Sequence, residues 1–118
     1  MFTTIGKNQV RNWLAGTTST APLAIAVGTT STSATINDTA LGGEVFRSAF
    51  DSTTISPQNV DYEVVMATTD ATTSTVTEMG LFNNTDSTSG DCFTRNTFAA
   101  ITKTSSIEIQ FDQRVEIN

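Results

Sequence analysis

The sequence predicts a mainly β protein: an antiparallel β-sandwich or jelly-roll-like barrel of six to seven strands, preceded by a short N-terminal α-helix. Two observations predict this class. Thr occurs 24 times and Ser 11 times in 118 residues, and the β-branched Thr side chain favours extended backbone. Apolar residues also alternate with polar ones in several segments, as in strands with one buried face. At this length we expect a single domain, residues 1–118.

The N-terminal segment 1–16 predicts the helix. From Thr4 to Ala15 the apolar residues fall roughly on one helical face, with Thr4 suited to cap the start and Gly16 suited to end it. A helix of about three turns is marginal alone in water, so it must dock on something. Two partners stay open: the chain's own sandwich, or a neighbouring subunit with the only Trp as anchor. In the second case the contacting residues would be Arg11, Trp13 and Leu14.

The strands follow the helix and are separated by polar turns. The alternation is clearest in Val60–Met66, where Val60, Tyr62, Val64 and Met66 share one predicted face. The turns are rich in Ser, Thr, Asn, Asp and Gly, whose side chains or backbone suit tight reversals. The predicted turns are Thr29–Asp38, Ser52–Asn59, Thr68–Thr73 and Asn83–Asp91. The predicted strands are Leu23–Val27, Glu44–Asp51, Val60–Met66, Val76–Phe82, Cys92–Ile101, Ile107–Asp112 and Arg114–Ile117.

The composition excludes several kinds of chemistry. With no His in the chain, a Ser-His or Cys-His nucleophile pair and a His-ligated zinc are impossible. A single Cys excludes an internal disulfide and a Cys-rich metal site. The net charge of −6 argues against binding to nucleic acid phosphates or to an anionic membrane. We therefore expect neither a nucleic acid nor a membrane as partner.

Carboxylates are the most numerous candidate catalytic groups. Asp61 and Glu63 lie on one face of a predicted strand, opposite its apolar face, and we interpret them as a solvated surface. Asp70, Asp86 and Asp91 lie in predicted turns and could in principle bind Ca²⁺. The Asp-x-Asp-x-Asp-Gly pattern with its trailing Glu is absent from the sequence, however.

Two further features are interpreted as structural. Gly42-Gly43 has no following Lys-Ser or Lys-Thr, which a phosphate-binding loop requires. Cys92 has an acidic neighbour, Asp91, and this is the opposite of what a reactive thiolate needs. We predict a small core residue at Cys92, and we predict no enzyme, no catalytic or metal-binding residues and no cofactor.

The N-terminus lacks the features of a targeting segment. Met1–Gly16 contains Lys7 and Arg11 and no run of seven or more apolar residues, which a secretory signal needs. The longest apolar stretch, Pro22–Val27, is far shorter than the roughly 20 residues of a membrane span. We expect synthesis in a cytoplasm, with export only as part of an assembly.

An ordered series of short segments carries a resemblance to a known family. Trp-Leu-Ala-Gly in the expected helix is followed by Ile25–Thr30 and Asp38–Glu44, with Arg47 beyond it. Later come Thr75–Phe82, Phe93–Phe98 and Ile101–Thr104, and then a last alternating strand. This order resembles small virion proteins of tailed bacteriophages. Its Glu-Met-Gly-Leu-Phe strand is similar to one in the N-terminal attachment module of phage tail fibres.

The resemblance implies a non-catalytic structural protein of the virion. We expect a tail, baseplate or fibre-adaptor component whose partners are other virion proteins, of the tail and baseplate or the major capsid protein, and copies of itself. The small size, the acidity and the absence of a fibre shaft favour a capsid decoration (cement) protein as the alternative. A carbohydrate- or host-surface-binding module is a second alternative, although Trp13 and Tyr62 are the only Trp and Tyr.

Overall fold

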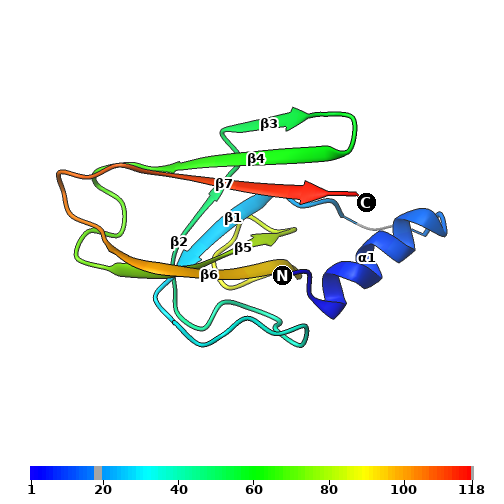
Figure 1. The fold of residues 1–118 in the computed structure, drawn as a ribbon, viewed down its shortest axis with the longest axis horizontal. Coiled ribbons are helices and arrows are strands. Elements are labelled where there is room, and N and C mark those ends of the chain that lie inside the picture. The colour runs from blue at the N-terminus through cyan, green and yellow to red at the C-terminus, as the bar shows by residue number, and fades with distance from the viewer. Residues whose placement is uncertain (18–19, 118) are drawn as a thin grey trace.

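The computed structural model describes residues 1–17 and 20–117, and these residues form one helix and seven strands. The strands make two antiparallel sheets that face each other, a four-stranded sheet in the order β2-β1-β5-β6 and a three-stranded sheet in the order β3-β4-β7 (Figure 1). This confirms the predicted class, and because the two sheets remain separate, the fold is a sandwich and not a closed barrel. The elements are α1 Thr4–Leu14, β1 Ala24–Gly28, β2 Glu44–Ala49, β3 Ser52–Ile55, β4 Asn59–Met66, β5 Thr75–Phe82, β6 Cys92–Thr102 and β7 Ile109–Glu116.

The hydrophobic core lies between the two sheets. It draws on the inward faces of β1, β4, β5, β6 and β7 (Ile25, Val27, Val64, Met66, Val76, Leu81, Phe93 and Phe111). A smaller apolar cluster, Ala26, Leu41, Phe82 and Cys92, lies on the other face of the four-stranded sheet. The loop 29–43 supplies Leu41 to this cluster, so the loop covers that face.

The pairing of β4 with β7 confirms one prediction and decides a point that the strand count left open. Val64 lies opposite Phe111 and Met66 opposite Ile109, so the alternation in Val60–Met66 marks a strand with a buried face. The prediction of six to seven strands left open whether the alternating segments Ile107–Asp112 and Arg114–Ile117 form one strand or two, and the structure joins them in the single strand β7. Its polar middle continues the ladder because Gln113 pairs through its backbone with Tyr62 and needs no buried side chain.

The predicted turn Ser52–Asn59 is wrong in its first half. Ser52–Ile55 forms the strand β3, paired with Val60–Glu63, and only the reversal that follows is a turn, closed by a 2.9 Å bond from the Ser56 N–H to the Asn59 carbonyl. All four residues of β3 are exposed, so the sequence carries no alternation there to indicate a strand. The other three predicted turns contain no strand among the described residues.

The N-cap of the helix lies one residue earlier than predicted. Thr3, and not Thr4, caps it, because the Thr3 hydroxyl oxygen accepts a 2.9 Å bond from the Gly6 N–H. The same hydroxyl donates to the Cys92 carbonyl of β6, which ties the cap to the sheet. After the helix, Gly16 adopts a left-handed φ of +76°, as the sequence predicts for a terminating glycine.

Candidate functional site

The predicted contact residues lie on the second half of α1. Trp13 stacks on Phe93 of β6, with ring centroids 5.8 Å apart, so the helix docks on its own sandwich, the first of the two alternatives. Leu14 is 86% exposed. Arg11 is exposed and donates to the side-chain oxygens of Asn8 and Asn12. The structure therefore brings only Trp13 into a tertiary contact and leaves Leu14 and Arg11 on the surface.

A buried carboxylate on β5 organises the face that loop 29–43 covers. Glu78 is fully buried, and its oxygens accept bonds from the backbone N–H groups of Thr30 (3.0 Å), Gly42 (3.0 Å) and Gly43 (2.9 Å). A fourth bond, of 2.9 Å, comes from Nε of Arg95 on β6. Four donors from three segments thus surround one ionised group, which is the arrangement that makes a buried charge tolerable.

Arg95 extends this network to the middle of the loop. Its Nη1 lies 3.1 Å from Oδ2 of Asp38, and its Nη2 donates a 2.8 Å bond to the Thr32 carbonyl. Asp38 in turn accepts a 2.8 Å bond from the Thr35 N–H. The two carboxylates and the guanidinium therefore fix both ends and the middle of loop 29–43 to the sheet, and we call this set the Glu78–Arg95–Asp38 clamp.

The clamp keeps both carboxylates ionised. Burial opposes the ionisation of Glu78, but the hydrogen bonds from Gly42 and Arg95, together with two further backbone N–H groups, outweigh it and lower the Glu78 pKa. The pKa of Asp38 is lowered in the same way, because bonds from Thr35 and Arg95 outweigh its burial. Both carboxyl groups therefore stay ionised down to a lower pH than ordinary Asp and Glu side chains do.

The glycines beside Glu78 are required by close approach. A Cβ at Gly28 would collide with the Glu78 carboxylate and would lie 2.8 Å from the Gly43 carbonyl. Gly42-Gly43, which the sequence shows to be unsuited to a phosphate, does bind an anion through its two N–H groups, but the anion is the chain's own Glu78. The glycines thus serve an internal site.

A second buried cation clamps loop 83–91. The Arg47 side chain is 1% exposed and pairs with Glu44 at 2.7 Å. Its Nη1 also donates to the carbonyls of Asn84 (2.9 Å) and Ser89 (2.6 Å), and its guanidinium carbon lies 4.0 Å from the centre of the Phe82 ring. We call this set the Arg47–Glu44 clamp.

Lys103 likewise holds a loop through a buried side chain. It is fully buried, and its Nζ donates to the carbonyls of Thr68 (3.0 Å) and Thr104 (3.1 Å). Its backbone exchanges bonds with Thr73 and Ser74, so it holds loop 67–74. Three of the chain's six basic residues thus have buried head groups committed to loops.

The carboxylates that the sequence singled out lie elsewhere. Asp61 forms an exposed pair with Arg114 of β7 at 2.8 Å, which agrees with a solvated strand face. Asp70 accepts a bond from the Ala67 N–H, and Asp91 accepts bonds from Gln9 and Asn83. Within residues 1–17 and 20–117, no three metal-ligating side chains gather at one place.

Cys92 is the buried core residue that the sequence predicts. It is fully buried, and burial, with a smaller effect of the Asp38 charge, raises the pKa of its thiol to about 12.

Because the thiolate is the reactive form, we expect the Cys92 thiol of the folded protein to leave Ellman's reagent unreacted at pH 8 over the time in which urea-unfolded protein reacts completely. Rapid release of one equivalent from the folded protein would contradict this burial.

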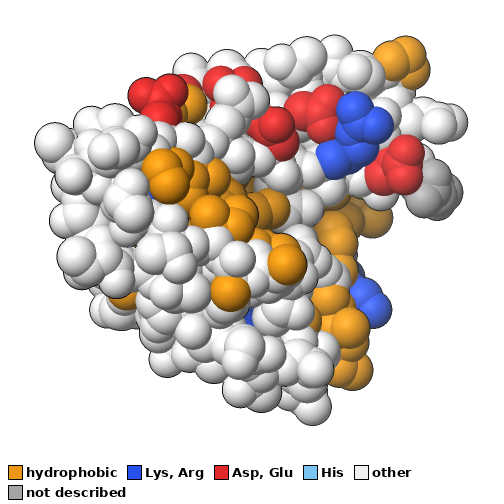
Figure 2. All heavy atoms as spheres, turned by 60° about the vertical axis from the view of Figure 1, so that its left-hand side comes forward, with side chains coloured by type: hydrophobic (Ala, Val, Ile, Leu, Met, Phe, Trp, Pro, Cys, Tyr) orange, Lys and Arg blue, Asp and Glu red, His pale blue; other side chains and the backbone are white. Residues whose placement is uncertain are grey.

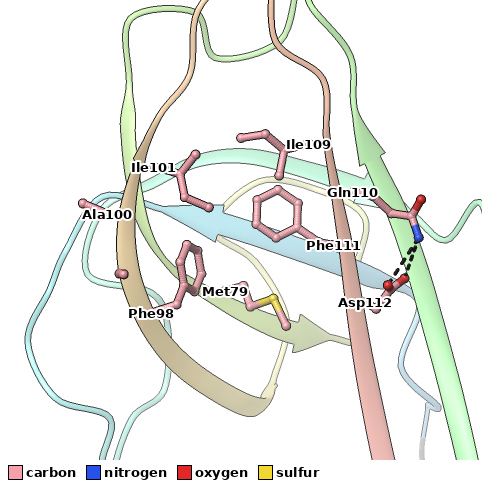
Figure 3. Close-up of a pocket in the computed structure, with 9 residues that line it drawn as sticks. Met79, Phe98, Ala100, Ile101, Ile109, Gln110, Phe111 and Asp112 are labelled. Atoms are coloured by element: carbon pink, nitrogen blue, oxygen red, sulfur yellow. Dashed lines mark hydrogen bonds between the residues drawn. The ribbon is translucent and has the colours of Figure 1, made fainter.

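One margin of the sandwich is open. Between β6 and β7 lies a groove of about 470 Å³, into which the apolar side chains of Met79, Phe98, Ile101, Ile109 and Phe111 point (Figure 3). The alternate β7 residues Gln110 and Asp112 point away from it and bond to each other. A space-filling view shows a band of exposed hydrophobic side chains, with most charged groups along its upper and right-hand margins (Figure 2).

The buried charges are the residues that sequence reasoning missed. Glu78 and Arg95 each interrupt a largely uncharged strand segment in a chain with only 15% charged residues, and this is the signal that could have identified them. Within the described part of the chain, no helix has the length and apolar character of a membrane span.

Comparisons with known protein families, curated proteins and solved structures found no match for this chain.

Proposed function

We propose that this chain is a structural protein of tailed-bacteriophage virions that acts without catalysis as a tail, baseplate or fibre-adaptor component. One observation carries the proposal. Four of the segments on which the family resemblance depends, Ile25–Thr30, Asp38–Glu44, Thr75–Phe82 and Phe93–Phe98, meet at the Glu78–Arg95–Asp38 clamp. In this chain, residues of these four segments together hold a surface loop against the sheet.

Rigid loops suit a protein that assembles. A segment that becomes ordered only on binding loses conformational entropy at that moment, whereas a loop fixed by buried charges avoids this loss. In a particle with many symmetric copies, each weak contact is multiplied. The clamps of Glu78, Arg47 and Lys103 each fix one surface loop, so they support a role in repeated protein–protein contacts.

The aromatic residues give less support to a carbohydrate-binding module. Such sites present exposed aromatic rings, but Trp13 stacks on Phe93 and Tyr62 stacks on Phe50 with ring centroids 4.3 Å apart. Each ring thus packs on a partner within the chain, although Trp13 remains 38% exposed.

Mass spectrometry of purified particles tests the proposal. Virions of the phage that encodes the chain would be dissociated and their heads and tails separated, with a phage replication protein from the same lysate as the negative control. We expect peptides of this chain in the tail fraction and none of the control. Peptides in the head fraction alone would support the decoration role instead, and absence from both fractions would overturn the proposal.

A further inference from the structure

We propose that the outer edge of β6 between Thr97 and Thr102 pairs antiparallel with the same edge of a second copy of this chain. The pairing would join two four-stranded sheets across a two-fold axis. This inference deepens the proposed assembly role and rests on it for its biological setting. It is carried by the order of the strands, by the pairing already made along β6, and by the distribution of charge.

β6 is an edge strand whose first part is already covered. Residues 1–3 lie antiparallel to it: the Arg95 N–H donates to the Met1 carbonyl at 3.0 Å, the Thr3 N–H donates to the Phe93 carbonyl at 2.9 Å, and Phe2 lies opposite Thr94. The covering ends there. Beyond Asn96, β5 is the only strand that pairs with β6 within residues 1–17 and 20–117. Among these residues, the edge that accepts residues 1–3 therefore continues for six residues with its outer side unpaired.

The unpaired part of this edge has no protection by charge. Thr97–Thr102 reads Thr-Phe-Ala-Ala-Ile-Thr, without Lys, Glu, Asp or Pro, which proteins place on edges to prevent pairing. The β7 edge, by contrast, carries the charged side chains of Asp112, Arg114 and Glu116. β3 is uncharged but only four residues long. β2 contains the charged residues Glu44 and Arg47, which pair with each other.

The charge distribution selects a second copy as the occupant. The chain carries a net charge of −6, so most contacts between two copies bring like charges together. At Thr97–Thr102 two copies meet without any charge, and an antiparallel pair of identical strands satisfies the two-fold symmetry that closes a dimer. The apolar groove next to the edge, with Phe98 and Phe111 at a centroid separation of 6.0 Å, supplies the apolar area that such a contact would shield.

The association is expected to be weak in solution. The pairing of β5 with β6 shifts between Val76 and Glu78, so Phe98–Ala100 form a bulge opposite Thr77, and bulges oppose regular edge pairing. Six residues of strand also bury less than the roughly 800 Å² per partner of a standard stable interface. We expect a monomer at about 10 µM and a substantial dimer fraction at about 500 µM, as for a dissociation constant on the order of 500 µM.

Sedimentation velocity over this concentration range tests the pairing. Ala100→Lys places a charge in the middle of the edge and should raise the dissociation constant at least about tenfold. The matched control is Ala49→Lys, at an exposed position on the β2 edge, which changes the net charge equally and should leave the dimer intact. Circular dichroism would establish that both variants fold. A wild-type monomer at every concentration, or equal dissociation constants for both variants, would overturn the inference.

Hydrogen–deuterium exchange locates the contact independently. On raising the concentration, the amides of Thr97–Thr102 should gain protection while those of Ser52–Ile55 remain unchanged. Protection at Ser52–Ile55 instead would overturn the inference. Its failure is distinguishable from that of the proposed function: a monomer that still occurs in virions rejects the edge pairing alone, and a dimer absent from virions rejects the virion role alone.

Discussion

Glu78→Ala is expected to lower the free energy of unfolding by about 3–5 kcal/mol, because it leaves the buried Arg95 guanidinium without its principal partner. The same change frees the N–H groups of Gly42, Gly43 and Thr30 that now bond to the carboxylate. Since single domains are stable by only about 5–15 kcal/mol, this loss is a large share of the total. Urea denaturation should show the midpoint falling by roughly 2 M.

Two further variants separate charge from shape and from surface effects. Glu78→Gln keeps an acceptor oxygen of nearly the same size but removes the charge, so its loss should be smaller than that of Glu78→Ala and still well above zero. Glu108→Ala, at an exposed position, should leave the midpoint nearly unchanged. Equal midpoints for Glu78→Ala and Glu108→Ala would show that the clamp contributes nothing to stability.

The lowered pKa of Glu78 predicts how the free energy of unfolding changes with pH. The Glu78 pKa is lower in the folded state than in the unfolded state, so near the unfolded value of about 4.3 the unfolded chain binds more protons. Its contribution to stability is therefore complete above that pH and is lost as the pH falls through the folded pKa. Glu78→Gln should flatten this part of the stability–pH curve, with a residual slope from Asp38, whose pKa is lowered as well.

The strands with a buried face were predictable from the sequence, and the clamps were not. Val60–Met66 alternates between apolar and polar residues because one face of β4 packs on the core, and this alternation can be recognised in the sequence alone. β3 was missed because its four residues are all exposed, so backbone pairing alone defines it. Glu78 looked like any strand carboxylate, because its donors come from residues 17 to 48 positions away.

For the helix, too, some features were predictable from the local sequence and others depend on distant residues. Its existence and its termination just before Gly16 followed from local rules of amphipathicity and C-terminal capping. Its place of docking did not follow from local rules. The helix lies so close to β6 that a Cβ at position 6 would be 2.9 Å from Cα of Phe93, so only a glycine fits there. Which side chains of the helix remain exposed, such as Leu14 at 86%, therefore depends on a contact between residues 87 positions apart.

Arg47→Ala is the second substitution with a large expected effect, again about 3–5 kcal/mol in the free energy of unfolding. The substitution leaves the Glu44 carboxylate, which is 4% exposed, without its cationic partner. It also removes the donor to the carbonyls of Asn84 and Ser89. Arg47→Lys keeps the charge but loses the planar fork that reaches both Glu44 and the loop, so it should recover only part of the loss. Arg114→Ala, which breaks the exposed pair with Asp61, is the matched control and should change the midpoint little.

Amide exchange then distinguishes two separate clamps from one general loss of stability. Arg47 binds carbonyls of loop 83–91, while Glu78 binds N–H groups of loop 29–43. Under native conditions, Arg47→Ala should therefore accelerate exchange mainly in 83–91, and Glu78→Ala mainly in 29–43. Local opening of this kind requires less free energy than global unfolding, so each variant marks its own loop. If both variants accelerated both loops equally, the two clamps would be one cooperative unit, and the loops could not act as independently fixed contact surfaces.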